Sequence, residues 1–348
     1  MIDKMCREYG LYLAMLFGVL AIQVVFSYGH LESTEELGIH PKRENLQEKV
    51  NFFEKMAMPS ARINMPLALF GAAAAIAGIF GLGIVADVIF AMKWFSAKGL
   101  GISFGASSAG DLGPWEVEDL FKLFVIFFFM ISCLHALLYA VLSAHWISMG
   151  VLQNISLVAG TAGLYAVVLI TLVAWRRKMY PMASVVSMPG WSNIGAAVGN
   201  GVVAYVAFIP PLVALMCLSL LACQWIGVEP EPHPIVEILQ HEKNLLRLMY
   251  LGMLTVFVGP LVEEIIFRGM AYSALRKRLG VAAAAASSAL LFAIAHTNVA
   301  QTLPVFGMGF VLAVLYETTG NLGASIVFHM INNTLAFVLT LFVLFWMK

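Results

Sequence analysis

The chain of 348 residues is 61% hydrophobic and only 11% charged, and its formal net charge is zero. A soluble domain carries about 25% charged residues, so this composition excludes an ordinary soluble protein and predicts one embedded in a membrane. The zero net charge gives no sign of a surface for nucleic acid, which is therefore not expected as a partner. The four cysteines show no CxxC spacing, which indicates buried apolar side chains rather than a disulfide framework.

Four apolar stretches in the first half of the chain are long enough to cross a bilayer, which takes about 20 residues. We expect membrane helices here over residues 9–28, 65–92, 119–144 and 151–175. The first follows Lys4 and Arg7 as a signal peptide would, but no small-residue cleavage pattern comes after it, so an uncleaved helix is favoured. The polar segment 29–64 is expected to hold an amphipathic helix at the membrane surface.

Five more apolar stretches follow, and we expect a tilt or a break in the first of them at Pro210 and Pro211. They cover residues 194–226, 245–268, 281–298, 303–318 and 322–346. Together with the stretches of the first half, they predict an all-α fold, a polytopic membrane helical bundle with roughly eight or nine transmembrane helices.

The basic residues favour a cytoplasmic N-terminus, because loops on the cytoplasmic side of a membrane carry an excess of Lys and Arg. With the N-terminus inside, the basic runs 176–178 and 276–278 also fall inside, and the acidic segment 229–242 falls outside. The prediction is an integral, multi-pass membrane protein surrounded by lipid.

Two adjacent carboxylates, Glu263 and Glu264, lie in an apolar stretch together with Arg268. A charged side chain at mid-bilayer costs roughly 2.5–3.5 kcal/mol, so residues of this kind are candidates for function. Glu264 and Arg268 are four residues apart and share a helix face, which predicts an ion pair that lowers the cost of both charges. Glu263 is turned about 100° away and is free to face a cavity as a general base or acid. The alternative is a charged cluster at a helix end, solvated by lipid headgroups.

Two histidines follow on later helices. His296 is the only ionisable residue of its span, and Phe292 lies one turn earlier, where its ring can pack against the imidazole. By itself, such a histidine is more often a packing residue than a functional one. His329 and Asn333 are four residues apart and so share a face. They bring two hydrogen-bond donors to one point, which suits either the stabilisation of an oxyanion or bonding between helices.

Taken together, the polar residues of three consecutive helices indicate one polar cavity. A carboxylate and an imidazole can hold and deprotonate a water molecule, while a second imidazole and an amide stabilise the oxyanion of a tetrahedral intermediate. This is the chemistry of a peptidase that uses water directly, and no Ser or Cys stands in an evident nucleophile motif.

The motifs EExxxR, FxxxH and HxxxN, in that order on consecutive late helices, resemble those of the CPBP family, the CAAX proteases and bacteriocin-processing enzymes also called Abi proteins. The resemblance covers about residues 195–344 and includes the Ras-converting CAAX endopeptidases. It implies a glutamic-type intramembrane endopeptidase with its core in residues 191–348. Residues 1–190 then form an N-terminal transmembrane segment with polar loops and no assigned function.

The resemblance also implies a role for each motif position. Water would be activated by Glu263 and His296 and the oxyanion held by His329 and Asn333, with Glu264, Arg268 and Phe292 in supporting positions. No cofactor is expected, although one Glu and two His can also bind Zn²⁺ with an open fourth position, and members of the family have been described as metalloproteases. A zinc-dependent version of the protease therefore remains an alternative.

Two further alternatives belong to other functional classes. The chain can be a non-catalytic membrane scaffold or regulator of the same fold, or a secondary transporter with Glu263 and His296 as a proton relay. The peptidase interpretation predicts a peptide or protein substrate at the membrane. No organellar signal is seen, so we expect a bacterial or archaeal plasma membrane as the location.

Overall fold

The computed structural model describes most of the second half of the chain and short parts of the first half. The described residues are 75, 77–88, 115–122, 124–126, 129–130, 132–133, 194–230, 236, 239–240, 242, 244–296 and 298–346. All the regular structure in these residues is helical, as predicted.

Several predictions fall outside these residues. The helices expected over 9–28 and 151–175 and the surface helix expected in 29–64 are not among the described residues, and those over 65–92 and 119–144 are described only in part. The total of eight or nine membrane helices and the orientation of the N-terminus therefore stay predictions, as does the division of the chain near residue 190.

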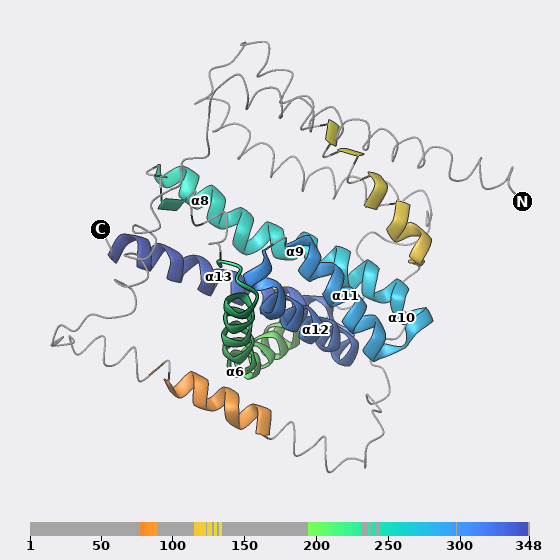
Figure 1. Cartoon of the computed structure of the whole chain (residues 1–348). Helices are drawn as coiled ribbons and strands as arrows, with labels where there is room; N and C mark the ends of the chain where they lie inside the picture. The colour runs from red at the N-terminus through yellow and green to blue at the C-terminus, as the bar shows by residue number, and fades with distance from the viewer. Residues whose placement is uncertain are drawn as a thin grey trace, which may run out of the picture. The chain divides into compact units, whose positions relative to one another are not determined.

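Every helix from residue 194 onward belongs to one compact unit, in which Figure 1 labels the α-helices. In chain order these helices are α6 (Ile194–Ile226), α8 (Leu245–Met253), the π-helix η1 (Leu254–Val258), α9 (Gly259–Glu264), the π-helix η2 (Ile265–Tyr272), α10 (Ser273–Leu279), α11 (Val281–Ala295), the 3₁₀-helix η3 (Val299–Gln301), α12 (Thr302–Thr319) and α13 (Leu322–Trp346). The helices α11 and α12 pack closely against each other, and α6 packs against both α12 and α13.

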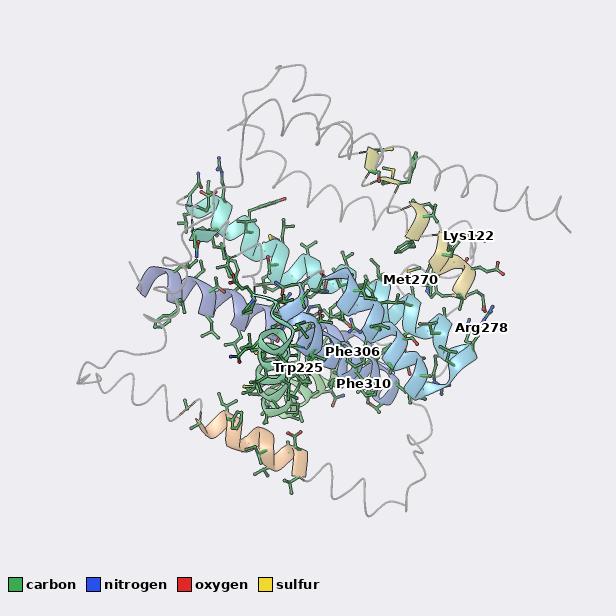
Figure 2. The ribbon with its side chains drawn as sticks, in the orientation of Figure 1. Lys122, Trp225, Met270, Arg278, Phe306 and Phe310 are labelled. Atoms are coloured by element: carbon green, nitrogen blue, oxygen red, sulfur yellow. The ribbon has the colours of Figure 1, made fainter. Side chains whose placement is uncertain are left out.

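Four helical stretches among the described residues are long and apolar enough to cross a membrane. They are Ile194–Ile226, Leu245–Leu279, Val299–Thr319 and Leu322–Leu344. The first is assigned as one helix through Pro210 and Pro211, so the prolines do not break it. Their outward side chains are largely apolar, and Trp225, 89% exposed near the end of α6, suits a membrane–water interface (Figure 2). These features are those of an integral membrane protein.

The predicted span over 281–298 is shorter than expected. It corresponds to α11, a helix of 15 residues, too short to count among these stretches. A helix of this length measures about 22 Å, whereas the hydrocarbon core of a bilayer is about 30 Å thick. Five of its apolar side chains are buried: Ala284, Ala285, Ala289, Phe292 and Ala293. Small alanine side chains allow close approach between helices, which explains how this face of α11 packs into the core.

The helix expected to end at Arg268 instead continues for eleven more residues. It begins where the Asn244 side chain accepts hydrogen bonds from two backbone N–H groups of the first turn, and it ends at Gly280, whose φ of 77° interrupts it. Arg268 is wholly buried, so the charged residues do not form a solvated helix end. The prediction was wrong because it took a charge as the end of the span, although a charge with a partner can lie inside one.

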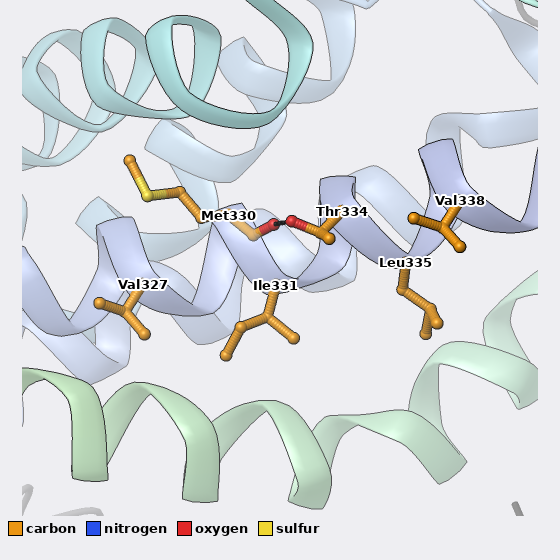
Figure 3. Close-up of a pocket in the computed structure, with 6 residues that line it drawn as sticks. All are labelled: Val327, Met330, Ile331, Thr334, Leu335 and Val338. Carbon is orange, nitrogen blue, oxygen red and sulfur yellow. Dashed lines mark hydrogen bonds between the residues drawn. The ribbon is translucent and has the colours of Figure 1, made fainter. Parts of the chain in front are cut away.

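An apolar groove runs along α13 but does not belong to the motif residues. It is lined by Val327, Met330, Ile331, Thr334, Leu335 and Val338 (Figure 3). Successive residues of a helix are turned by about 100°, which places the centre of this lining on the side of α13 opposite to His329. The candidate site therefore lies on the other face of the helix.

Candidate active site

The two carboxylates lie at the end of α9, a short α-helical segment between the π-helices η1 and η2. Such π-helical turns are rare and frequently occur at functional sites. Glu264 is fully buried, whereas the side chain of Glu263 is 23% exposed. The difference is the one expected from the turn of about 100° between neighbouring residues. One carboxylate therefore points into the protein and the other toward more open space.

The buried carboxylate is paired with a buried guanidinium. The Nη1 atom of Arg268 donates to Oε1 of Glu264 at 2.7 Å, and both side chains are inaccessible to solvent. The predicted ion pair is thus present. The Nη2 atom of Arg268 donates to the backbone oxygen of Gly309 on α12 at 3.1 Å, and its Cζ lies 4.5 Å from the centre of the Phe292 ring. These contacts offset the cost of burying the two charges.

His329 approaches both carboxylates. Its Nδ1 lies 2.9 Å from Oε1 of Glu264, and its Nε2 lies 3.8 Å from Oε2 of Glu263. Since the ionised carboxylate of Glu264 can only accept, Nδ1 carries the hydrogen of this bond. A neutral ring then has a lone pair at Nε2, and Nε2 becomes a donor only when the ring is protonated. An oxyanion role for His329 therefore requires the imidazolium, whereas the sequence suggested a neutral donor.

Asn333 lies one turn after His329, and its side-chain amide makes two hydrogen bonds. Its Nδ2 donates to the backbone oxygen of Thr255 at 2.9 Å, and its Oδ1 accepts from Nδ2 of Asn332 at 3.2 Å. Thr255 belongs to the π-helix η1, so the irregular turn supplies a carbonyl to the site. One N–H of the Asn333 amide remains after these two contacts.

His296 reaches the same region through Phe292. Its Nδ1 lies 2.8 Å from the backbone oxygen of Phe292, which can only accept, so Nδ1 carries the hydrogen and the neutral ring has its lone pair at Nε2. The fully buried Phe292 ring contacts His296 at 4.5 Å and His329 at 5.7 Å between ring centres. The three motifs, far apart in sequence, thus meet around one aromatic ring. Glu263 and His296 make no hydrogen bond or ion pair with each other.

Glu263, His296 and His329 are the side chains of the site that the zinc alternative would use as ligands. Among the described residues, no three His, Cys, Asp or Glu side chains lie close enough together to hold a metal ion. The zinc-dependent version of the protease stays an alternative to the metal-free one.

A second buried polar network was missed in the sequence. Glu317 near the end of α12 accepts a hydrogen bond from the Tyr272 hydroxyl at 2.7 Å and two from Arg276 at 3.2 and 3.1 Å. It fixes α10 and η2 to α12. Glu317 is the only charged residue of the span expected over 303–318, and this isolated charge could have indicated a buried polar contact.

The close approach of α11 and α12 depends on Gly309. A Cβ atom at this position would lie 3.0 Å from Cα of Ala289 and 3.2 Å from a ring carbon of Phe292. We expect Gly309→Ala to destabilise the protein by about 1–3 kcal/mol, because overpacking displaces α11 and the Arg268 contact. Thermal unfolding in detergent measures this. Gly199→Ala is the matched control, since a Cβ there meets nothing within 4 Å, and equal melting temperatures for the two variants would contradict the prediction.

Comparison with known proteins gives the family of this region. The family model described as Type II CAAX prenyl endopeptidase Rce1-like matches residues 245–335. This match supports the assignment of residues 245–335 to the CPBP family. This CPBP region extends from the start of α8 into α13 and contains all seven residues of the three motifs.

Two curated bacterial proteins are similar to part of the chain. The chain is 34% identical over 84 residues to the putative membrane peptidase YdiL of Bacillus subtilis, a match that covers 24% of the chain and 34% of the relative. It is 37% identical over 83 residues to the membrane-embedded CAAX protease MroQ of Staphylococcus aureus, which covers 22% of the chain and 33% of the relative. The chain thus spans about a third of the length of these relatives. No solved structure matches it.

Proposed function

We propose that the protein is an intramembrane endopeptidase that cleaves peptide bonds with an activated water. The observation that supports this is that Arg268, His296 and His329 all contact the Phe292 ring, while His329 also lies close to both carboxylates. The family of the region and the names of its relatives, a membrane peptidase and a CAAX protease, agree with this reaction class.

Glu263 and His296 are proposed to activate the water. Glu263 is the accessible carboxylate and can accept a proton. The Nδ1–H of His296 is bound to a backbone oxygen, which leaves the Nε2 lone pair to accept a hydrogen bond from the same water. The proton taken from the water is then available for the leaving amine when the peptide bond breaks.

Asn333 and protonated His329 are proposed to stabilise the oxyanion. Asn333 contributes the N–H that neither Thr255 nor Asn332 engages. Glu264 orients the ring of His329 through the bond to Nδ1, and the ion pair with Arg268 holds Glu264 in place. Preorganised donors of this kind contribute on the order of 10²–10³ to the rate of acyl transfer.

The substrate is proposed to be a peptide or protein that reaches the site from the membrane. The region around the site is built from helices with lipid-facing apolar surfaces, so a segment anchored in the bilayer has direct access. Because the relatives are bacterial, the proposed location is a bacterial plasma membrane. The distribution of basic residues supports a cytoplasmic N-terminus. The N-terminal segment 1–190 has no proposed role.

A reconstituted assay tests the reaction and its metal requirement together. We expect the purified protein in lipid vesicles to cleave a lipid-anchored, fluorescence-quenched peptide, and to keep its rate in 1,10-phenanthroline or EDTA, because the proposed chemistry uses only side chains and water. Product masses from mass spectrometry locate the cut. A rate that disappears with chelator and returns with zinc would replace this proposal by the zinc-dependent alternative.

A further inference from the structure

Asn333 is held by two neighbours that agree on the direction of its amide. The Thr255 carbonyl requires a donor, and it faces Nδ2 at 2.9 Å. The Nδ2 of Asn332 offers a donor, and it faces Oδ1 at 3.2 Å. Turning the amide by 180° would set oxygen against oxygen at Thr255 and nitrogen against nitrogen at Asn332, so both hydrogen bonds would be lost at once.

The orientation of this amide decides what it can do chemically. In the observed direction the remaining group of Asn333 is an N–H, which can bind a developing oxyanion. In the turned direction, the atom in that place would be a carbonyl oxygen, which would repel the oxyanion. The Thr255 contact comes from the backbone of η1, whereas the Asn332 contact comes from a side chain that can be replaced.

We infer that Asn332 is a positioning residue of the site, because its N–H fixes the amide of Asn333 in the direction that presents a donor. This inference rests on the proposed function and deepens it. Asn332 lies outside the three motifs, and it acts through Asn333 rather than on the substrate. Its side chain is half-buried on the helix that also carries His329.

The substitutions Asn332→Ala and Asn332→Asp distinguish positioning from packing. Asn332→Ala removes one of two contacts, and we expect kcat to fall about three- to tenfold while KM changes less than twofold. Asn332→Asp keeps the shape of the side chain but replaces the donor by an oxygen that faces Oδ1 of Asn333. We expect it to lower kcat further than alanine does. A packing role predicts the reverse order, because aspartate fills the same space.

The control is Thr334→Ala on the same helix. The Thr334 hydroxyl bonds to its own helix at the Met330 oxygen, so its loss leaves Asn333 untouched, and we expect the wild-type kcat. Melting temperatures are measured for every variant. If Asn332→Asp fails to fold, the double variant Asn332→Ala with Asn333→Ala tests the positioning role instead. We expect it to have the same kcat as Asn333→Ala alone, because Asn332 acts only through Asn333.

The failures of the two proposals can be told apart with the lipid-anchored, quenched peptide as probe. If the wild type does not cleave it, or if Glu263→Gln cleaves as fast, the proposed function fails and the inference falls with it. If the wild type cleaves and Glu263→Gln does not, the inference alone is overturned by a wild-type kcat in Asn332→Ala. It is also overturned if Asn332→Ala lowers kcat by the same factor with and without Asn333.

Discussion

Replacing Glu263 by glutamine is expected to lower the rate of peptide cleavage by at least about 100-fold, because glutamine cannot accept the proton of the attacking water. The effect should appear in kcat, since the amide keeps the size and hydrogen-bonding reach of the carboxylate. The measurement is the initial rate of cleavage of the quenched peptide in vesicles, with wild type and variant at equal protein concentration.

The fold is expected to tolerate this change. The side chain of Glu263 is partly exposed, and its nearest charged partner, Nε2 of His329, lies at 3.8 Å, beyond a good hydrogen bond. The melting temperature should therefore stay close to that of the wild type. A folded Glu263→Gln that retains more than a tenth of the wild-type rate would exclude Glu263 as the base and favour the non-catalytic scaffold.

Arg268→Met is expected to give the largest loss of stability. It leaves the Glu264 carboxylate charged and buried, and breaking a buried ion pair on one side costs about 3–5 kcal/mol. It also removes the contact with the Gly309 carbonyl that joins η2 to α12. Thermal or denaturant unfolding of the purified protein in detergent measures the loss.

The double variant Glu264→Gln with Arg268→Met is the control for this prediction. Removing both charges leaves no unpaired ion in the interior, so we expect it to recover a large part of the lost stability. Activity should not recover with it, since His329 then lacks the carboxylate at Nδ1. A single variant as stable as wild type would show that the pair contributes little to the fold.

The bounds of a membrane helix could be predicted from the sequence where the apolar run ends at polar residues. The helix predicted over 303–318 is observed as Thr302–Thr319, and the helix predicted over 322–346 is observed as Leu322–Trp346. The predicted ends were wrong at Arg268, where the charge interrupts the apolar run but not the helix, and at α11, which is shorter than the apolar run that predicted it. An apolar run does not show which charged side chains form ion pairs or hydrogen bonds with other helices of the bundle.

The candidate site could be predicted only as far as contacts within one helix. The spacing of four residues placed Glu264 with Arg268 and Phe292 with His296, and both contacts are present. The bond between Glu264 and His329 joins residues 65 positions apart. No local spacing shows such a contact. Nor does the sequence show the π-helical turn that brings the carbonyl of Thr255 to Asn333, because the turn depends on the packing around it.

His296 has a second task that follows from its hydrogen bonds. Its backbone N–H bonds to Ala293, three residues back, and its imidazole Nδ1–H donates to the carbonyl of Phe292, four residues back. The ring is thus a cap on the last turn of its own helix. A substitution that removes this donor is expected to fray the turn that carries Phe292. An inactive His296→Ala variant would therefore not show whether activity was lost with the basic nitrogen or with the end of the helix. Asparagine, which keeps a donor and lacks the basic nitrogen, is the substitution that separates them.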